Sequence, residues 1–209
     1  MGLPEGVSRR SFAGGEQLAT RGEPVGEEPT QGGWRQWDPH RSKFAAMLEG
    51  GLETGLGPEA TVLYLGAAAG TTVSHVADVA GPTYAVEFAP RPVRDLLDVA
   101  ADRQNLFPLL KDARRPGTYA HVVEAPVDLL IQDVATTGQA RVATLNAQFL
   151  APDGRLLLAI KARSEDVTRN PAAVFDTALE DLASTFEVLG TRDLAPYHED
   201  HLGVVATPR

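Results

Sequence analysis

Lysine is scarce in this chain, and its few positions are the first candidates for chemistry. Of the 19 lysine and arginine residues, only Lys43, Lys111 and Lys161 are lysines, although lysine is normally one of the commonest residues. A lysine retained in such a background is a candidate for work that arginine cannot do, because an amine can lose its proton at moderate pH. A lysine can hold a hydroxyl group and lower its pKa, or act as a base when its own pKa is depressed.

A second group of candidates follows the predicted strands. The first strand runs into a glycine turn that begins at Gly66, and the next four run into Glu87, Asp112, Asp133 and Lys161. Ligands of open α/β sheets bind beyond the carboxyl ends of the strands. We therefore expect these five groups to meet at one rim of a sheet and to form one shared site.

The glycine turn indicates which ligand this site binds. Gly66 and Gly70 let the backbone pass close to a ligand, and Glu87 lies at the distance typical of an acid that binds ribose hydroxyls. The dinucleotide pattern needs a glycine between them, however, and Ala68 and Ala69 interrupt it. An adenosine ligand without a pyrophosphate fits better, and we expect S-adenosylmethionine.

Other rim residues complete the expected adenosine site. Asp112 can accept a hydrogen bond from the adenine amine, and Thr71 and Thr72 open the helix after the glycine turn. Phe88 can pack on the adenine ring, or it can be an ordinary core residue.

The elements that position these residues alternate between strand and helix. The apolar runs predict strands over residues 61–65, 83–88, 106–110, 127–132, 155–160, 186–192 and 202–207. Amphipathic segments predict helices over residues 41–52, 71–79, 91–103, 138–150 and 171–185. This order predicts an α/β fold with a doubly wound, mostly parallel, Rossmann-like sheet.

The N-terminal segment has a different composition. Residues 1–33 are rich in Gly, Glu, Pro and Thr, and the segments 10–13 and 17–21 can pair around Gly14 and Gly15. We expect a short, poorly ordered arm or a minimal β-appendage here, followed by one catalytic domain over residues 34–209.

Composition excludes several classes of protein. Hydrophobic residues make up 43% of the chain, which excludes wholesale disorder, and no apolar run is long enough to cross a membrane. The absence of cysteine excludes disulfides, thiolate zinc sites and cysteine nucleophiles. With no secretory signal either, we expect a cytoplasmic protein. The net charge of −9 and the lack of lysine favour adaptation to high salt over an ordinary acidic protein of a GC-rich genome.

Six segments of the chain carry motifs specific enough to indicate a family. They are WDPHRSKFAAMLEGGL, VLYLGAAAGTTVSHVADVAGPTYAVEFAPRPVRDLL, PLLKDARRP, VDLLIQDVA, LNAQFLAPDGRLLLAIKAR and LAPYHEDHLGVVA. The most specific part is LGAxxGTTVSHV with RSK before it. These segments strongly resemble fibrillarin, the S-adenosylmethionine-dependent methyltransferase of box C/D ribonucleoprotein particles, in an archaeal form, and the resemblance covers residues 34–209.

The resemblance implies ribose 2′-O-methylation of RNA, namely rRNA and also tRNA, at sites chosen by a box C/D guide RNA. It also implies a catalytic set of Lys43, Asp133, Lys161 and His201. The rim argument reaches Asp133 and Lys161 independently. His201 lies at the same rim if the last strand runs antiparallel.

The resemblance further implies the cofactor contacts and the partners. The expected partners are guide and target RNA, a Nop-domain scaffold protein and a kink-turn-binding protein, with no metal. The chain departs from the family at Thr136-Thr137-Gly138-Gln139, where Gln-Pro-Asp-Gln is typical. The expected cofactor contacts are Gly66, Ala67, Gly70, Thr71, Thr72, Glu87, Phe88, Asp112, Ala113, Asp133, Val134, Ala135, Thr136 and Gln139.

Three other functions compete with this one. They are a methyltransferase for a small molecule or a protein, a non-catalytic scaffold that binds RNA or protein, and an NAD-type oxidoreductase, which the missing glycine disfavours. The acidic charge opposes RNA binding, unless partner proteins hold the RNA or arginines form a local basic face. The arginines of that face would be Arg35, Arg41, Arg114, Arg115, Arg163 and Arg169, whereas His40, His75, His121 and His198 are expected to be structural or exposed.

Overall fold

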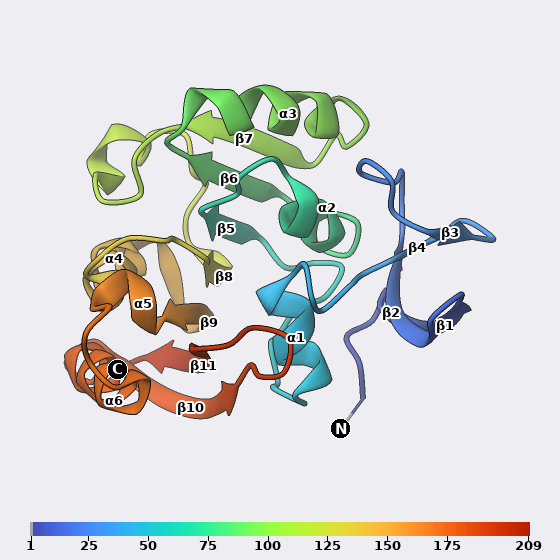
Figure 1. Ribbon diagram of the computed structural model, residues 1–209. Helices are drawn as coiled ribbons and strands as arrows, with labels where there is room; N and C mark the ends of the chain where they lie inside the picture. Colours follow the sequence, from blue (N-terminus) through green and yellow to red (C-terminus); the bar gives the residue numbers. More distant parts are fainter. Residues whose placement is uncertain (1) are drawn as a thin grey trace.

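A seven-stranded sheet forms the centre of the molecule (Figure 1). The computed structural model describes residues 2–209. The strand order is β10-β11-β9-β8-β5-β6-β7, in which only β11 runs antiparallel to its neighbours. The mostly parallel α/β fold expected from the sequence is thereby confirmed. The strands are β5 (Val62–Leu65), β6 (Thr83–Glu87), β7 (Leu106–Leu110), β8 (Val127–Gln132), β9 (Leu150–Lys161), β10 (Phe186–Asp193) and β11 (His201–Pro208).

The direction of winding reverses between β5 and β8. From β5 the chain moves outward through β6 to β7, then returns to place β8 on the other side of β5. Leu65 and Gln132 are register partners, so the loops that follow them start side by side. Gly66 has a φ of 86°, and a Cβ at this position would overlap the carbonyl oxygen of Asp133. Glycine is therefore required at this point, where ligands bind in sheets of this kind.

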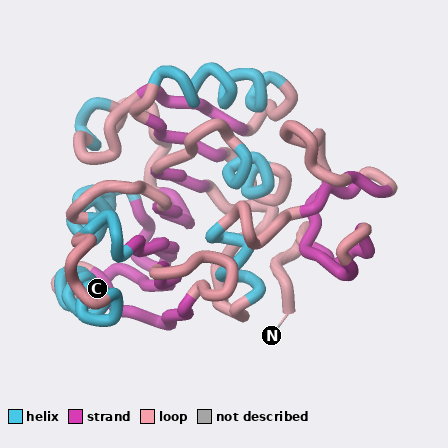
Figure 2. Tube along the Cα trace, in the orientation of Figure 1, coloured by secondary structure: helices cyan, strands magenta, loops and turns pink. Residues whose placement is uncertain are grey.

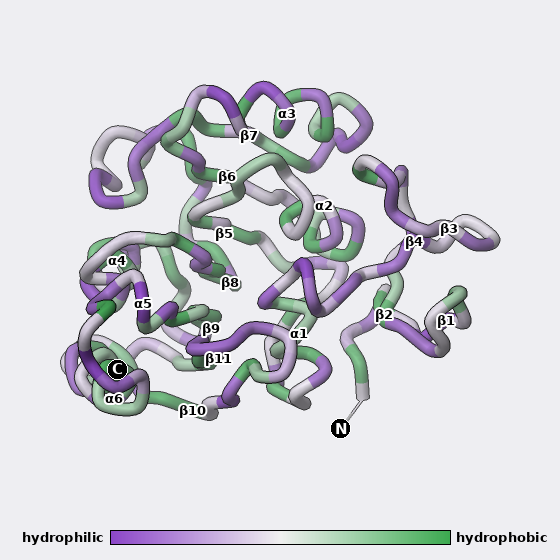
Figure 3. The backbone as a smooth tube through the Cα atoms, viewed as in Figure 1, coloured by the Kyte–Doolittle hydropathy of each residue, from purple (hydrophilic) through white to green (hydrophobic). Residues whose placement is uncertain are grey.

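Helices cover both faces of the sheet. One apolar core forms under α1 (Lys43–Glu49), α2 (Thr71–Ala77) and α3 (Pro90–Ala101), and the other under α4 (Gln139–Asn146) and α6 (Pro171–Leu182). Figure 3 shows the hydropathy behind these layers: β5 is apolar throughout, whereas α3 alternates between polar and apolar residues. Among the described residues, no helix is long and apolar enough to span a membrane.

The N-terminal segment forms a second sheet beside α1 and α2 (Figures 1 and 2). Its four antiparallel strands are β1 (Ser8–Phe12), β2 (Gly15–Arg21), β3 (Thr30–Gln31) and β4 (Trp34–Gln36), in the order β1-β2-β4-β3. The first two form the hairpin expected around Gly14 and Gly15. However, β4 pairs with β2 and β3, so this sheet extends past the boundary that was expected after residue 33.

A group of buried charges attaches the N-terminal sheet to the main domain. The Arg35 guanidinium is fully buried, with Nε 3.0 Å from Oε2 of Glu28 and Nη2 donating to Oγ of Ser74 over 2.6 Å. Asp78 lies between Arg35 and Arg103, at 3.4 Å and 2.8 Å. We call Glu28, Arg35, Asp78 and Arg103 the buried ion cluster. Arg35 was expected on an RNA-facing surface, and that prediction was wrong, because Glu28, Ser74 and Asp78 hold its side chain inside.

Most boundaries lie within three residues of the sequence prediction, and two differ by more. The helix expected over residues 138–150 ends at Asn146, and β9 begins at Leu150, five residues before the expected start at Arg155. Leu150 already pairs with Val127, and the register then shifts, which accommodates the extra residues of β9 as a bulge. The short helices α5 (Ala162–Glu165), η1 (Pro116–Thr118) and η2 (Ala147–Phe149) were not expected.

Candidate active site

The expected rim residues meet at one edge of the main sheet. Glu87 ends β6, Asp133 follows β8 directly, and Lys161 ends β9. Because β11 runs antiparallel to β9, its first residue, His201, is the register partner of Lys161. The sequence argument for His201 depended on this strand direction, which is confirmed. What these residues do chemically is a separate question.

Lys43 reaches the same edge from the first position of α1. Ser42 caps this helix by accepting a hydrogen bond from the backbone N–H of Ala45. Nζ of Lys43 then lies 2.9 Å from Oδ2 of Asp133, and both side chains are about three-quarters buried, at 24% and 26% exposure. This rim ion pair joins two segments that lie 90 residues apart in the sequence.

His201 is buried, and its two ring nitrogens have different surroundings. Nδ1 lies 2.6 Å from the backbone carbonyl oxygen of Glu199, which fixes the proton on Nδ1 as a donor. Nε2 is buried without a hydrogen-bond partner within residues 2–209. Burial lowers the pKa of His201, and the positive charges of Lys43 and Lys161 lower it further despite the contact with Glu199. The ring is therefore a neutral imidazole with a free lone pair.

Two nearby groups complete this half of the site. The ammonium group of Lys161 has no hydrogen-bond or ion-pair partner in the described chain. The ring of His198 lies 5.6 Å from that of His201, and its Nε2 is also buried without a partner. Sequence reasoning treated His198 as structural or exposed. Its position three residues before His201 was the one available signal that it belongs here.

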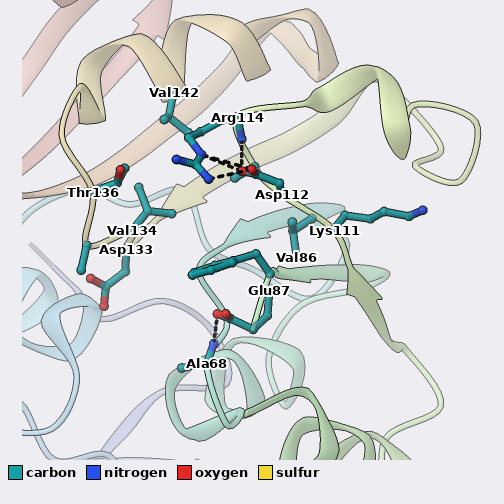
Figure 4. A pocket seen from close by; sticks show the side chains of 14 residues that line it. Ala68, Val86, Glu87, Lys111, Asp112, Arg114, Asp133, Val134, Thr136 and Val142 are labelled. Carbon is teal, nitrogen blue, oxygen red and sulfur yellow. Dashed lines mark hydrogen bonds and ion pairs between the residues drawn. The ribbon is translucent and has the colours of Figure 1, made fainter. Parts of the chain in front are cut away.

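A cavity of about 290 Å³ opens beside these residues, between the ends of β5, β6, β7 and β8 (Figure 4). This volume is close to the lower limit of about 300 Å³ for small-molecule sites. Nine of the fourteen expected cofactor contacts line the cavity, namely Gly66, Glu87, Phe88, Asp112, Ala113, Asp133, Val134, Ala135 and Thr136.

One wall of the cavity carries the expected ribose-binding acid. The two carboxylate oxygens of Glu87 accept hydrogen bonds from the backbone N–H groups of Ala68, at 3.0 Å, and Ala89, at 2.9 Å. A carboxylate has about four acceptor positions, so two remain for ligand hydroxyls. The Phe88 side chain is 69% exposed at the cavity, which excludes the alternative that it is a core residue.

The opposite wall carries Asp112, which is held by Arg114. Nε and Nη2 of Arg114 donate to Oδ1 and Oδ2 of Asp112 over 2.9 Å and 2.8 Å, and the backbone N–H of Arg114 donates to Oδ1. These hydrogen bonds lower the pKa of Asp112. Asp112 therefore faces the cavity as an ionised acceptor, and Figure 4 shows it across from Glu87.

Five expected cofactor contacts lie outside this cavity, and five unexpected residues line it. Gly70 instead starts α2 with a φ of 96°, and Gln139 is completely buried against the backbone of Lys161. The other three are Ala67, in the glycine turn, and Thr71 and Thr72, the first two residues of α2. The unexpected lining residues are Ala68, Val86, Lys111, Arg114 and Val142. The sequence could have indicated Arg114 as a residue of this cavity, because it follows Asp112 by two residues.

The basic face expected near the rim is small. Arg114 is paired with Asp112, Arg163 with Asp200 at 2.8 Å, and Arg169 donates to backbone and side-chain oxygens of α6. Arg41 and Arg115 are exposed. Among the described residues, no three His, Asp or Glu side chains are grouped closely enough to hold a metal ion.

A family model, a curated relative and solved structures all match this chain to the same family. A family model described as Fibrillarin matches residues 14–209. The chain is 69% identical to the fibrillarin-like rRNA/tRNA 2′-O-methyltransferase of Haloarcula marismortui, covering 100% of this chain and 99% of that protein. The crystal structure of Aeropyrum pernix fibrillarin with natively bound S-adenosyl-L-methionine is similar at a TM-score of 0.88 and 41% identity, covering 99% of this chain and 96% of that one.

A further crystal structure, of a fibrillarin/Nop5p complex, is similar over the full length of both chains, at a TM-score of 0.90 and 36% identity. The family match includes most of the N-terminal sheet as well as the main domain. The family that the sequence resembles is thus the family that the comparisons find. This chain belongs to the fibrillarin family.

Proposed function

We propose that this chain transfers a methyl group from S-adenosylmethionine to ribose 2′-hydroxyls of rRNA and tRNA. One observation carries the proposal: a cavity suited to adenosine and four catalytic candidates share one rim of the sheet. Those candidates are Lys43, Asp133, Lys161 and His201. The 2′-O-methyltransferase of Haloarcula marismortui, which is 69% identical to this chain, supports the same reaction. Its haloarchaeal source agrees with the adaptation to high salt that the acidic composition of this chain favours.

The cavity suits the methyl donor by its own chemistry. Glu87 retains acceptor positions for ribose hydroxyls, Asp112 faces it as an acceptor for the adenine amine, and Phe88 offers an exposed ring for stacking. The donor supplies an already activated methyl group on a sulfonium sulfur. The protein's contribution is therefore mainly alignment, which can supply a large part of the rate.

The four catalytic candidates divide the remaining work. Asp133 holds the Lys43 ammonium in place, while the free ammonium of Lys161 can donate a hydrogen bond to the reacting ribose oxygen. As that oxygen bonds to the methyl carbon, the bond between this carbon and sulfur breaks and leaves its electron pair on sulfur, and the hydroxyl proton must leave. Nε2 of His201 is a buried nitrogen without a partner in the described chain, and its ring lies close enough to both lysines for their charges to lower its pKa, so we assign it the proton.

Partner molecules complete the proposed function. We infer that a guide RNA selects the site, a Nop-domain scaffold carries this chain, and a kink-turn-binding protein holds the guide. The net charge of −9 opposes recruitment of RNA by this chain alone, and few arginines at the rim are free. The similar fibrillarin/Nop5p complex supports the scaffold.

Calorimetry tests the choice of cofactor. We expect S-adenosylmethionine to bind and NAD not to bind, since the turn at Gly66 lacks the glycine that admits a pyrophosphate. Tight NAD binding without a response to S-adenosylmethionine would overturn the proposed reaction.

Transfer of labelled methyl groups tests the substrate. The chain is assayed with RNA alone, then with scaffold, kink-turn protein and guide, at low and high salt. We expect little transfer by the isolated chain and site-selective ribose methylation in the assembly. Full, selective activity of the isolated chain would indicate a stand-alone enzyme. Transfer only to small molecules or proteins would indicate the competing methyltransferase class.

A further inference from the structure

Gln139 is a completely buried polar residue whose amide group is bonded to the backbone of Lys161. Its Oε1 accepts a hydrogen bond from the Lys161 N–H at 2.9 Å, and its Nε2 donates to the Lys161 carbonyl oxygen at 3.1 Å. The pairing of β8 with β9 ends at Gln132 and Leu158, three residues before Lys161. The Gln139 side chain therefore takes the place of a missing strand at the end of β9.

Glu165 holds Gln139 in that position. Its Oε1 accepts from the backbone N–H of Gln139 at 2.7 Å and from Nε2 of Gln139 at 2.9 Å, and its Oε2 accepts from the N–H of Gly138 at 2.7 Å. The helix that begins at Gln139 has no side-chain cap and no acidic residue in its own first turn. Glu165 supplies that cap from α5, where a negative charge at a helix N-terminus is stabilising.

A fifth hydrogen bond holds the backbone of Gln139. Nε2 of Gln132, the last residue of β8, donates to the backbone carbonyl oxygen of Gln139 at 2.8 Å. The contacts of Gln139 thus join the strand that precedes Asp133, the loop that lines the cavity and the strand end that carries Lys161. Among the described residues, the side chains of Gln139 and Glu165 are not hydrogen-bonded to the side chain of any catalytic candidate, and the contact with Lys161 is to its backbone alone.

We propose that Gln139 and Glu165 form a clamp that positions Lys161 relative to Asp133 and the methyl donor. Both act as positioning residues through the backbone of Lys161, and the inference rests on the proposed function. A long, flexible lysine aligns a hydroxyl only if its backbone is fixed, and a misplacement of about 1 Å can cost roughly 10²-fold in rate. Gln139, expected as a cofactor contact, thus has a different role.

The central variant is Gln139→Met, which keeps the length of the side chain and removes its amide. In the assembled particle we expect the kcat of this variant to fall about 10- to 100-fold. The Kd for S-adenosylmethionine and the KM for target RNA should change less than about threefold, because the Gln139 side chain is buried outside the cavity. Glu165→Gln should also lower kcat, but by a smaller factor than Gln139→Met. Asp166→Asn is the matched control, because this neighbouring carboxylate accepts hydrogen bonds from Thr168 and has none with Gln139 in the described chain.

Non-additivity separates positioning from a general structural effect. In a Lys161→Arg background, measured under single-turnover conditions, Gln139→Met should cause little further loss of rate, because the residue through which it acts is already changed. Equal losses in both backgrounds would overturn the proposal, as would an unchanged kcat in Gln139→Met. If Gln139→Met does not fold, Glu165→Gln carries the same comparison.

Hydrogen exchange distinguishes failure of the clamp from failure of the proposed function. The wild-type assembly is assayed in parallel, and an absence of RNA methylation there would count against the function itself. Independently of activity, the Lys161 amide should be protected from exchange in the wild type and lose protection in Gln139→Met. An equally protected amide in both proteins would refute the clamp even where methylation is normal.

Discussion

The molecule holds two groups of opposite charges in different ways. In the buried ion cluster, the side chains of Glu28, Arg35 and Asp78 are at most 4% exposed, and their partners come from the N-terminal sheet, α2 and the end of α3. In the rim ion pair, Lys43 and Asp133 are about a quarter exposed. The first group has its charges matched internally, whereas the second lies beside an unpaired lysine and an imidazole with a free lone pair.

The difference separates a structural role from a chemical one. Burying charges is costly, and the cost is offset only where every charge has a partner in good geometry. Such a group holds the N-terminal sheet in place but has nothing left to offer a substrate. At the rim, the unmatched donor and acceptor are what a reacting hydroxyl needs. We therefore expect mutations in the two groups to affect different measurements.

The largest effect should come from Arg35→Met. It leaves the carboxylates of Glu28 and Asp78 buried without the guanidinium that lies 3.0 Å and 3.4 Å away. Breaking a buried pair in this way typically costs about 3–5 kcal/mol. Denaturant unfolding should show this loss, while kcat of the protein that remains folded stays near the wild-type value.

The control is Arg9→Gln, which breaks an ion pair with Glu49 in which the Arg9 side chain is 41% exposed. That change should cost about 1 kcal/mol or less. If Arg35→Met costs no more than Arg9→Gln, the buried cluster does not hold the two sheets together.

The next effect concerns His75, which stacks on Trp37 at 4.9 Å between their ring centroids and binds Thr20. Burial lowers the pKa of His75 to about 4, from an ordinary value of 6.5. Above pH 6.5, His75 is neutral in the native and the unfolded state. Below pH 6.5, the unfolded chain binds a proton at His75, whereas the native chain does not bind it until the pH reaches about 4. The native state should therefore lose about 3 kcal/mol of stability as the pH falls through that window.

Unfolding at several pH values between 7 and 4 checks this. The stability of His75→Gln should fall less steeply than that of the wild type, whereas the same change at the exposed His121 should leave the slope as it was. Parallel curves for wild type and His75→Gln would mean that His75 titrates normally in the native protein.

At the rim the expected effect is on rate. Asp133→Ala and Lys161→Ala should each lower methyl transfer by roughly 10²-fold or more, the scale for removal of a positioned polar group. Their melting temperatures should change little, because both side chains are partly exposed. A large melting shift with a modest loss of rate would place these residues with the structural group instead.

The sequence predicted much of the rim because its signals are local. Each strand is a short apolar run followed directly by its polar residue, so Glu87, Asp133 and Lys161 could be assigned to one edge without a structure. His201 needed one further fact, the direction of β11. The scarcity of lysine made Lys43 a candidate, but only the resemblance to fibrillarin placed it in the catalytic set, because no periodicity could indicate its approach from α1.

The roles of Arg35 and Gln139 could not be predicted in the same way. An arginine is normally exposed, and Arg35 is buried because Glu28 of the N-terminal segment meets Ser74 and Asp78 of α2 and its C-cap around it. Gln139 follows the loop that lines the cavity, and the sequence does not specify that its amide points to the end of β9 instead. Both cases depend on tertiary contacts.

The smallest effect should come from an exposed pair at the cavity, Asp112 and Arg114. Arg114→Ala removes the guanidinium, but the backbone N–H of residue 114 still donates to Oδ1 of Asp112 and keeps that carboxylate oriented. Exposed ion pairs contribute little, so the affinity for S-adenosylmethionine should fall by about fivefold or less.

A salt series sharpens this prediction. Near molar salt, where the Debye length is about 3 Å, the affinities of the wild type and of Arg114→Ala should become equal. Asp112→Asn should cost more than Arg114→Ala at every salt concentration, because it removes the negative charge and replaces one of the two acceptor oxygens with an NH2 donor. Calorimetry across a salt series provides the measurement. If Arg114→Ala lowers the affinity for S-adenosylmethionine more than tenfold and the loss persists at high salt, Arg114 contacts the cofactor directly. Its charge would then belong to the cofactor site and would do more than orient Asp112.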